Sequence, residues 1–190
     1  MENKLKNICK SYGDKRVLTN VNLTLTPGEI TCVMGASGIG KTTLMGILAG
    51  TVKADAGEVL TTQLVSAVFQ EDRLLEWETA LSNVLFVTNP ASQYVEKAKQ
   101  LLTQAGLGDS INKKAAELSG GMKRRVCICR ALIADYDLLI LDEPFKGLDS
   151  EIKPVIMGMV KEHLRKNACA VCVTHDAAEV AFFGRRLVAL

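Results

Sequence analysis

A glycine-rich segment at residues 35–43 limits the folds open to this chain more than any other feature. Its residues fit the pattern G-x-x-x-x-G-K-[ST]: Gly35, Ala36, Ser37, Gly38, Ile39, Gly40, Lys41, Thr42 and Thr43. Glycines let the backbone turn tightly, so that successive N–H groups point at phosphate oxygens. The residues before the segment are typical of a strand and those after it of a helix, which favours a phosphate-binding loop over a glycine turn beside a surface lysine. We therefore predict that the whole segment binds nucleotide, with Lys41 against the β- and γ-phosphates and Thr42 as a Mg²⁺ ligand.

Two adjacent acids, Asp142 and Glu143, follow the apolar stretch 138–141. A strand buried on both faces should not end in two carboxylates without a cation or another partner, because burying charge is costly. The alternative is a strand that ends in solvent. Beside a phosphate-binding loop, however, the pair predicts that Asp142 is a Mg²⁺ ligand and that Glu143 polarises the water that attacks the γ-phosphate.

Strand-like and helix-like segments alternate along most of the chain, which favours an α/β fold with a mainly parallel sheet and helices on both faces. The expected strands are 30–34, 138–141 and 168–173, and the expected helices are 41–49, 121–134, 154–166 and one from about 176. An antiparallel strand is expected within 17–30 and a short strand pair around 57–69. Residues 74–117 are helical in pattern, most clearly at 94–105. We predict one domain over 1–190, with a P-loop NTPase core (about 1–71 and 118–190), a small antiparallel β-subdomain and an inserted helical subdomain (about 72–117).

Composition excludes several classes of protein. The 190 residues carry a net charge of only +2, whereas a nucleic-acid surface usually needs a clear basic excess. No apolar run approaches the roughly 18 residues needed to span a bilayer. The N-terminal residues are too polar for a secretory signal. We expect a cytosolic protein whose role at a membrane, if it has one, depends on a partner.

The six cysteines raise the possibility of a zinc site or disulfides. Only Cys169 and Cys172 have the spacing of metal ligands, and a single C-x-x-C without a second pair is weak evidence. This pair also lies in an apolar strand, where residues three apart point to opposite faces. We therefore interpret the cysteines as small buried thiols.

The segment Leu118-Ser119-Gly120-Gly121-Met122 resembles the LSGGQ signature of ABC ATPases and departs from it only in its last residue. Other segments match this family in the family's order along the chain. They are Tyr12 (the aromatic residue that stacks on adenine), Gln70 (the Q-loop glutamine), Gly147-Leu148-Asp149 (the D-loop) and His175 (the switch histidine). The resemblance covers essentially the whole chain.

The resemblance implies a catalytic arrangement shared by two subunits. Ser119, Gly120 and Gly121 would contact ATP bound to the other copy, so that an ATP-dependent homodimer encloses two nucleotides. His175 would contact the γ-phosphate and Glu143, and Gln70 would reach the Mg²⁺ or the attacking water. ATP and Mg²⁺ are the expected cofactors, and Glu143, His175 and Gln70 the expected catalytic residues.

The stretch from Phe69 to Trp77 looks like the Q-loop region of importers of nitrate, taurine and alkanesulfonates, which usually carry Pro where this chain has Glu76. It implies an ATPase that powers import through transmembrane permease subunits, with a solute-binding protein, on the inner face of the cell membrane. Two alternatives are a non-transport ABC ATPase acting on nucleic acid or ribosomes, and a binding-only regulatory cassette. The first would normally have paired cassettes, a coiled coil or a basic arm, and the second would lack a catalytic residue.

Overall fold

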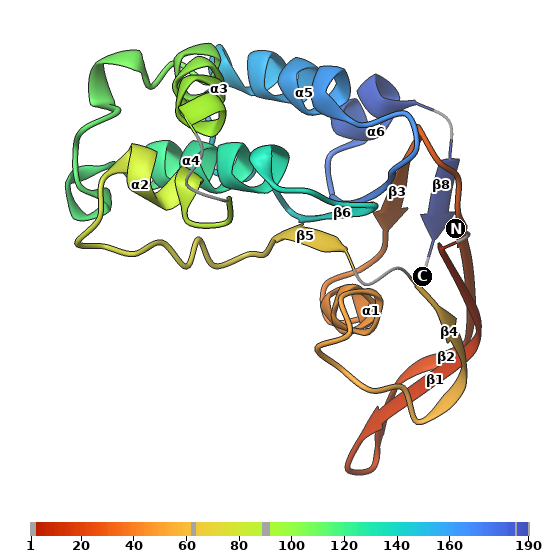
Figure 1. Cartoon of the computed structure of the whole chain (residues 1–190). Coiled ribbons are helices and arrows are strands. Elements are labelled where there is room, and N and C mark those ends of the chain that lie inside the picture. Colours follow the sequence, from red (N-terminus) through yellow and green to blue (C-terminus); the bar gives the residue numbers. More distant parts are fainter. Residues whose placement is uncertain (1–2, 62–63, 89–91, 185, 190) are drawn as a thin grey trace. The chain divides into compact units, whose positions relative to one another are not determined.

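The computed structural model describes residues 3–61, 64–88, 92–184 and 186–189, and these form two compact units (Figure 1). The first unit comprises Met1–Ala67, Tyr136–Glu143 and Leu164–Leu190. The second comprises Val68–Asp135 and Pro144–His163. The chain therefore passes between the units several times, and each unit is assembled from segments distant in sequence. Among the described residues, no helix has the length and apolar character needed to cross a membrane.

The first unit is built around a five-stranded sheet with the strand order β5-β6-β7-β3-β8. The strands are β3 (Ile30–Met34), β5 (Val65–Val68), β6 (Leu138–Asp142), β7 (Cys169–Val173) and β8 (Arg186–Ala189). Strand β3 pairs in parallel with β7 and β8, and β6 pairs in parallel with β7. Every residue of β6 and β7 is buried, as expected for central parallel strands. The predicted parallel sheet is confirmed, whereas β8 was not predicted, because so short a run shows little periodicity.

A second, antiparallel sheet has the order β2-β1-β4. Its strands are β1 (Asn3–Tyr12), β2 (Lys15–Leu25) and β4 (Ala56–Leu60). Strand β2 confirms the antiparallel strand predicted within 17–30, and the sheet itself is the predicted small β-subdomain. Strand β1 was not predicted, because Asn7, at a φ of 53°, and several register shifts interrupt its alternation.

The prediction of a strand pair around 57–69 is wrong in one respect. Both strands exist, as β4 and β5, but they do not pair with each other. Strand β4 pairs with β1 in the antiparallel sheet, and β5 lies beside β6 in the other sheet. A short apolar run can predict that a strand forms, but its partner depends on long-range packing.

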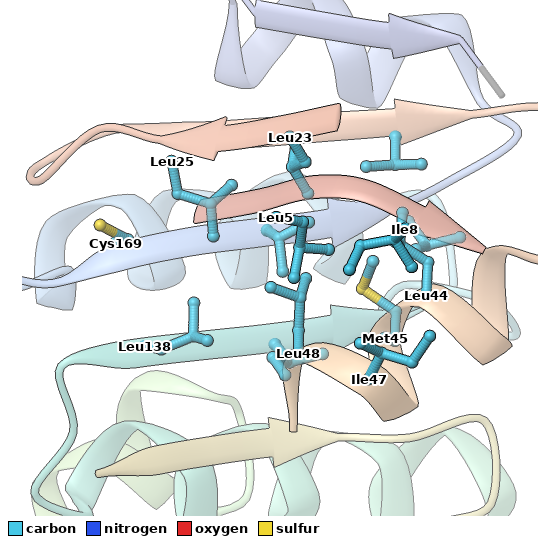
Figure 2. Close-up of a cluster of buried hydrophobic side chains, with 14 of the residues drawn as sticks. Leu5, Ile8, Leu23, Leu25, Leu44, Met45, Ile47, Leu48, Leu138 and Cys169 are labelled. Carbon is cyan, nitrogen blue, oxygen red and sulfur yellow. The ribbon is translucent and has the colours of Figure 1, made fainter. Parts of the chain in front are cut away.

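One hydrophobic cluster joins both sheets to helix α1 (Lys41–Leu48) (Figure 2). Its members are Leu5, Ile8, Leu18, Leu23, Leu25, Val33, Leu44, Met45, Ile47, Leu48, Leu138, Ile140, Cys169, Val171 and Val173. Helix α1 begins directly after the glycine-rich segment and contributes four of these side chains, Leu44, Met45, Ile47 and Leu48. The cluster therefore fixes the helix that carries the end of the glycine-rich loop. The first unit also contains α6 (Ala177–Phe183).

The second unit is helical. It contains α2 (Ala80–Leu85), α3 (Ser92–Gln104), α4 (Gly120–Ile133) and α5 (Ile152–His163), with short 3-10 helices at Gly108–Ser110 and Ala115–Glu117. Helix α3 buries Ala98, Leu101 and Leu102 at helical spacing, so the helix predicted at 94–105 is confirmed. Fully buried Asn83 bonds the backbone N–H and C=O of Leu75, which ties the segment before α2 to that helix.

The two compact units do not coincide with the predicted core and insertion. Helices α4 and α5 belong to the same unit as α2 and α3, although the sequence analysis placed only residues 72–117 in the helical subdomain. Helix α4 packs against α2, α3 and α5, which accounts for its place in this unit. The prediction of one domain, divided into a core and an inserted helical subdomain at about 72–117, remains a prediction.

We expect Leu5→Ala to lower the free energy of unfolding by about 2–5 kcal/mol, because it leaves a cavity in the shared cluster. Leu5 is 0% exposed, whereas Val59, its register partner on β4, is 38% exposed. Val59→Ala is therefore the matched control and should cost under about 1 kcal/mol. Urea unfolding followed by circular dichroism measures both variants, and equal losses would contradict the assigned core.

Candidate active site

The glycine-rich loop joins β3 to α1 and encloses the ammonium group of Lys41. Lys41 Nζ donates hydrogen bonds to the carbonyl oxygens of Gly35 and Ala36, each at 2.8 Å, and the residue is only 6% exposed. Residues 36–39 are exposed. The loop thus combines the buried ammonium group of Lys41 with exposed backbone at residues 36–39. This arrangement suits the binding of an anionic phosphate chain.

Gly40 occupies a position that no other residue fits. It caps α1 with a φ of 114°. A Cβ atom there would lie 2.7 Å from Leu18 Cδ2 and 2.9 Å from Val17 Cγ1, both of which belong to β2. The close approach of β2 therefore requires glycine, and it fixes the backbone just before Lys41.

Thr42 and Asp142 come together at the start of α1 and the end of β6. Thr42 Oγ1 donates a hydrogen bond of 3.2 Å to Asp142 Oδ2, and Asp142 is 1% exposed. A hydroxyl and a carboxylate side by side are the oxygen ligands that Mg²⁺ prefers. These two residues therefore fit the ion that the sequence analysis predicts. The third predicted ligand, Gln70, lies in the second unit, and its role stays a prediction.

Glu143 and His175 also meet in the first unit. His175 Nε2 lies 2.9 Å from Glu143 Oε1, and the side chain of Glu143 is 11% exposed. Glu143 has a φ of 48°, a left-handed conformation that is uncommon outside glycine and often marks functional residues. Its N–H donates to the carbonyl of Val173, so the strained residue is fixed against the end of β7. A carboxylate held this way can orient a water molecule and accept its proton.

A buried acid secures the loop that carries His175, and the sequence analysis missed it. Thr174 Oγ1 donates to Glu179 Oε2, and both residues are at most 5% exposed. The N–H of Asp176 donates to Thr174 Oγ1, and Asp176 in turn caps α6. The signal that could have revealed this contact is a glutamate in the first turn of a short helix directly after the histidine.

The signature segment forms the start of α4. Ser119 is the N-cap, and its Oγ accepts a hydrogen bond of 3.3 Å from the N–H of Met122. Ser119 and Gly120 are exposed, and a Cβ on Gly121 would lie 3.2 Å from the carbonyl oxygen of Gly147 in the D-loop. An exposed helix N-terminus with these small residues suits an anion. The contact with a second subunit's ATP stays a prediction.

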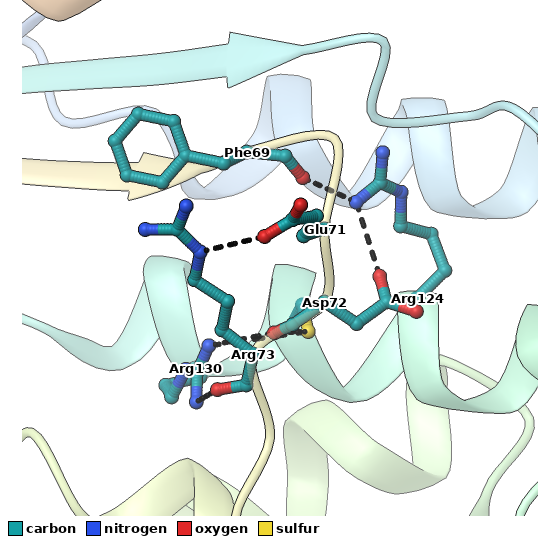
Figure 3. A network of polar contacts seen from close by, with 7 residues as sticks. Phe69, Glu71, Asp72, Arg73, Arg124 and Arg130 are labelled. Carbon is teal, nitrogen blue, oxygen red and sulfur yellow. Dashed lines mark hydrogen bonds and ion pairs between the residues drawn. The ribbon is translucent and has the colours of Figure 1, made fainter.

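Tyr12 belongs to the first unit and Gln70 to the second. Tyr12 ends β1, is 52% exposed, and has Lys10 Nζ 5.4 Å from its ring centroid. Its exposed ring is available for stacking, which stays a prediction. Gln70 is exposed, in a turn directly after β5. Residues on either side of this turn bond to α4 through Arg124, a contact that the sequence analysis missed (Figure 3).

The six cysteines are free thiols, and most of them are buried. Five of them are buried: Cys32, Cys127, Cys129, Cys169 and Cys172. Burial raises the pKa of Cys32 to about 11 and that of Cys129 to about 12, so these thiols stay protonated at neutral pH. The described residues include no cluster of three or more potential metal ligands. The interpretation as buried thiols is confirmed for these five, whereas Cys9 is only partly buried.

We expect Gly40→Ala to lower ATP affinity by at least about tenfold (about 1.4 kcal/mol), because the added methyl group displaces the loop from β2. Gly50→Ala is the control. Gly50, which follows α1 and lies outside the glycine-rich loop, also has a positive φ, of 72°, but a Cβ there would meet no described atom within 4 Å. It should therefore lower the free energy of unfolding by only the cost of a left-handed conformation, about 1–2 kcal/mol. Titration with a fluorescent ATP analogue, beside thermal unfolding, separates the two effects, and equal affinities would refute the steric argument.

Comparison with known proteins identifies the family. The ABC transporter family matches residues 18–146. The aliphatic sulfonates import ATP-binding protein SsuB 2 of Pseudomonas syringae pv. syringae is 38% identical over 98% of this chain and 68% of its own length. The bicarbonate transport ATP-binding protein CmpD of Synechocystis sp. is 39% identical over 97% of this chain and 72% of its own.

Solved structures agree. The dimeric post-hydrolysis state of the ATP-binding cassette MJ0796, bound to ADP and Pi, matches with a TM-score of 0.87 and 31% identity, over 100% of this chain and 94% of that one. The ADP conformation of MJ1267, another ATP-binding cassette of an ABC transporter, matches with a TM-score of 0.82 and 26% identity, over 100% and 87%. The predicted P-loop NTPase fold is thus confirmed. Since its sequence matches the family model and these relatives and its fold matches solved cassettes, the chain belongs to the ABC transporter family, as an ATP-binding subunit that hydrolyses ATP.

Proposed function

We propose that this ATPase powers the import of a small solute through a separate membrane permease. The observation that carries the proposal is that the residues for phosphate binding and for water activation lie in one compact unit, in a chain similar to import ATP-binding proteins. The alternative, a non-transport ATPase acting on nucleic acid or ribosomes, is not favoured, because the relatives are named for transport.

ATP binding begins at the glycine-rich loop. Lys41 exchanges its two carbonyl partners for oxygens of the β- and γ-phosphates, and the N–H groups of the loop bind the remaining oxygens. Thr42 and Asp142 would hold Mg²⁺, with Gln70 as a further ligand. When bound, this ion neutralises charge on the phosphates. Tyr12 stacks on the adenine.

Hydrolysis depends on Glu143 and His175. Glu143 orients a water molecule toward the γ-phosphate and accepts its proton. His175 lies 2.9 Å from this carboxylate and contacts the γ-phosphate when ATP is present. The left-handed backbone of Glu143 and the bond from Thr174 to Glu179 preorganise the two side chains.

The active form is a homodimer. Ser119, Gly120 and Gly121 present the N-terminus of α4, and they bind the γ-phosphate of ATP held by the other copy. The similar cassette MJ0796, which forms a dimer in its ADP and Pi state, supports this arrangement. ATP binding closes the dimer and hydrolysis opens it again.

The permease docks on the helical unit. Trp77 and Phe86 are each 69% exposed and Val87 is 46% exposed, all within the segment 77–87 around α2. Such large exposed apolar side chains are typical of interaction sites. In the cell we place the protein at the cytoplasmic face of the membrane, bound to the permease, with a solute-binding protein on the opposite side.

Replacing the proposed base tests the catalytic roles. Glu143→Gln should keep ATP binding and lower turnover by about 10²–10⁴-fold, because the amide cannot accept the proton. With ATP and no Mg²⁺ it should form a stable dimer, measured by size-exclusion chromatography with light scattering. Turnover at the wild-type rate would remove Glu143 from this role.

Ser119→Arg in the Glu143→Gln background is the control for the dimer. The bulky cation should leave ATP binding by the monomer intact and prevent the ATP-dependent shift to a dimer. Loss of ATP binding by the monomer would show instead that Ser119 acts within its own subunit.

The permease proposal is tested by co-purification. The tagged chain, expressed in its native host, should retain a membrane protein with several transmembrane segments after detergent extraction. Trp77→Ala with Phe86→Ala should weaken this retention by at least about tenfold, because two large anchors are lost. Val155→Ala, at another exposed apolar residue of the same unit, is the control and should retain it. Retention of ribosomes or DNA in place of a membrane protein would contradict the transport role.

A further inference from the structure

One face of helix α4 holds the turn that contains Gln70 (Figure 3). Arg124, Cys127 and Arg130 follow one another at intervals of three, so they lie along one side of the helix. All three donate hydrogen bonds to the segment 69–73. These residues belong to the same compact unit. The turn is therefore attached to α4 by hydrogen bonds from three side chains of that helix.

Arg124 bonds the chain on both sides of Gln70. Its Nη1 donates to the carbonyl oxygen of Phe69 and, at 3.1 Å, to Asp72 Oδ1. The side chains are 5% exposed for Arg124 and 27% for Asp72. Because this ion pair is largely withdrawn from solvent, salt screens it much less than it screens a surface pair. Gln70 itself remains exposed between the two contacts.

The backbone after Gln70 is fixed just as closely. The carbonyl oxygen of Asp72 accepts from Cys127 Sγ at 2.8 Å and from Arg130 Nη2 at 3.1 Å. Arg130 Nη1 donates to the carbonyl oxygen of Arg73, which has a φ of 45°. Burial raises the pKa of Cys127 to about 12, which keeps its thiol protonated and able to donate. The strained conformation of Arg73 thus persists because its neighbours fix it.

The same helix begins at the signature serine. Ser119 caps α4, and Arg124 lies in its second turn. A helix rises only about 1.5 Å per residue and is stiff over so short a length. Lys123 adds a second link, since its Nζ lies 3.0 Å from Glu76 Oε2. A displacement of the turn at Gln70 is therefore transmitted to Ser119 through a few covalent and ionic contacts.

We propose that Arg124, paired with Asp72, is a positioning residue that makes Gln70 and Ser119 move as one body. The inference rests on the proposed function, in which Gln70 responds to ATP in its own subunit and Ser119 binds ATP of the other. When Gln70 shifts toward the occupied site, Arg124 carries that shift to the cap of α4. ATP bound at the subunit's own site thereby changes the position of Ser119, which lies at the proposed dimer interface.

The charge of this pair suits a positioning role better than a stabilising one. A buried ion pair is weak evidence for stability, because the cost of removing both charges from water offsets most of their attraction. The same segment also carries a matched exposed pair, Arg73 Nε with Glu71 Oε2 at 3.3 Å, with side-chain exposures of 67% and 79%. Such exposed pairs contribute little, so Glu71→Gln is an internal control.

The test compares Asp72→Asn, Arg124→Lys and Glu71→Gln in the full chain. Asp72→Asn removes the charge with little change of shape, and Arg124→Lys keeps the charge but replaces the planar guanidinium with a compact ammonium group on a shorter side chain. We expect both to lower kcat by about tenfold while the Kd for ATP changes by less than about twofold, because the glycine-rich loop is intact. Glu71→Gln should behave as the wild type, and Asp72→Glu, which keeps the carboxylate, should recover part of kcat.

Trp77 supplies a second readout that does not need turnover. It is the only tryptophan of the chain, and it directly follows Glu76, which is bonded to α4. Wild-type protein should change its tryptophan emission on binding ATP without Mg²⁺, and Asp72→Asn should reduce this change by at least about half. If the emission changes differ as expected but no membrane protein is retained in the co-purification, the positioning role stands and the proposed transport function fails.

Other outcomes would overturn the inference. A wild-type kcat and emission change in Asp72→Asn would show that the pair transmits nothing. A lowered kcat in Asp72→Asn that recovers at low temperature, in step with a lowered melting temperature, would show a structural role only. An equal loss in Glu71→Gln would show that any change near Gln70 has this effect. No emission change in the wild type would remove the movement that the inference requires.

Discussion

A carboxylate at the end of a fully buried strand is the constraint on which the first unit depends. Asp142 is 1% exposed, and a buried charge is costly unless hydrogen bonds or a cation compensate it. Its bond from Thr42 requires the start of α1 to lie against the end of β6. The shared hydrophobic cluster, to which α1 contributes four side chains, holds that position (Figure 2). The core of this unit therefore supports the site, because any displacement of the helix would separate Thr42 from Asp142, the two proposed Mg²⁺ ligands.

Glu143, which follows Asp142, combines a strained backbone conformation with a proposed catalytic role. Glu143 adopts a left-handed backbone, which costs about 1–2 kcal/mol for a residue with a side chain. It is also the last residue of the first unit before the chain enters the second. Its N–H bonds to Val173 and its carboxylate meets His175, so strand β7 and the loop after it maintain the strain. The group proposed to activate water is thus fixed where the chain passes between units.

Helix α4 organises the second unit in a comparable way. Its first residue follows the cap Ser119, one side bonds the turn at Gln70, and its apolar residues pack against α2 and α3. Exposed apolar side chains lie in the segment around α2. The proposed permease surface, the Gln70 turn and the signature are therefore attached to one helix.

The sequence by itself determined the features that depend on neighbours in the chain. These are the glycine-rich loop between a strand and a helix, the acids that end an apolar strand, and the helix after the signature, since turn chemistry and periodicity are local. Only the tertiary structure decided which distant groups meet. It separated β4 from β5 into two sheets, and it joined Thr42 to Asp142 and Asp72 to Arg124. The pattern of one segment does not name its partner, because pairing follows from burial and register across the whole fold.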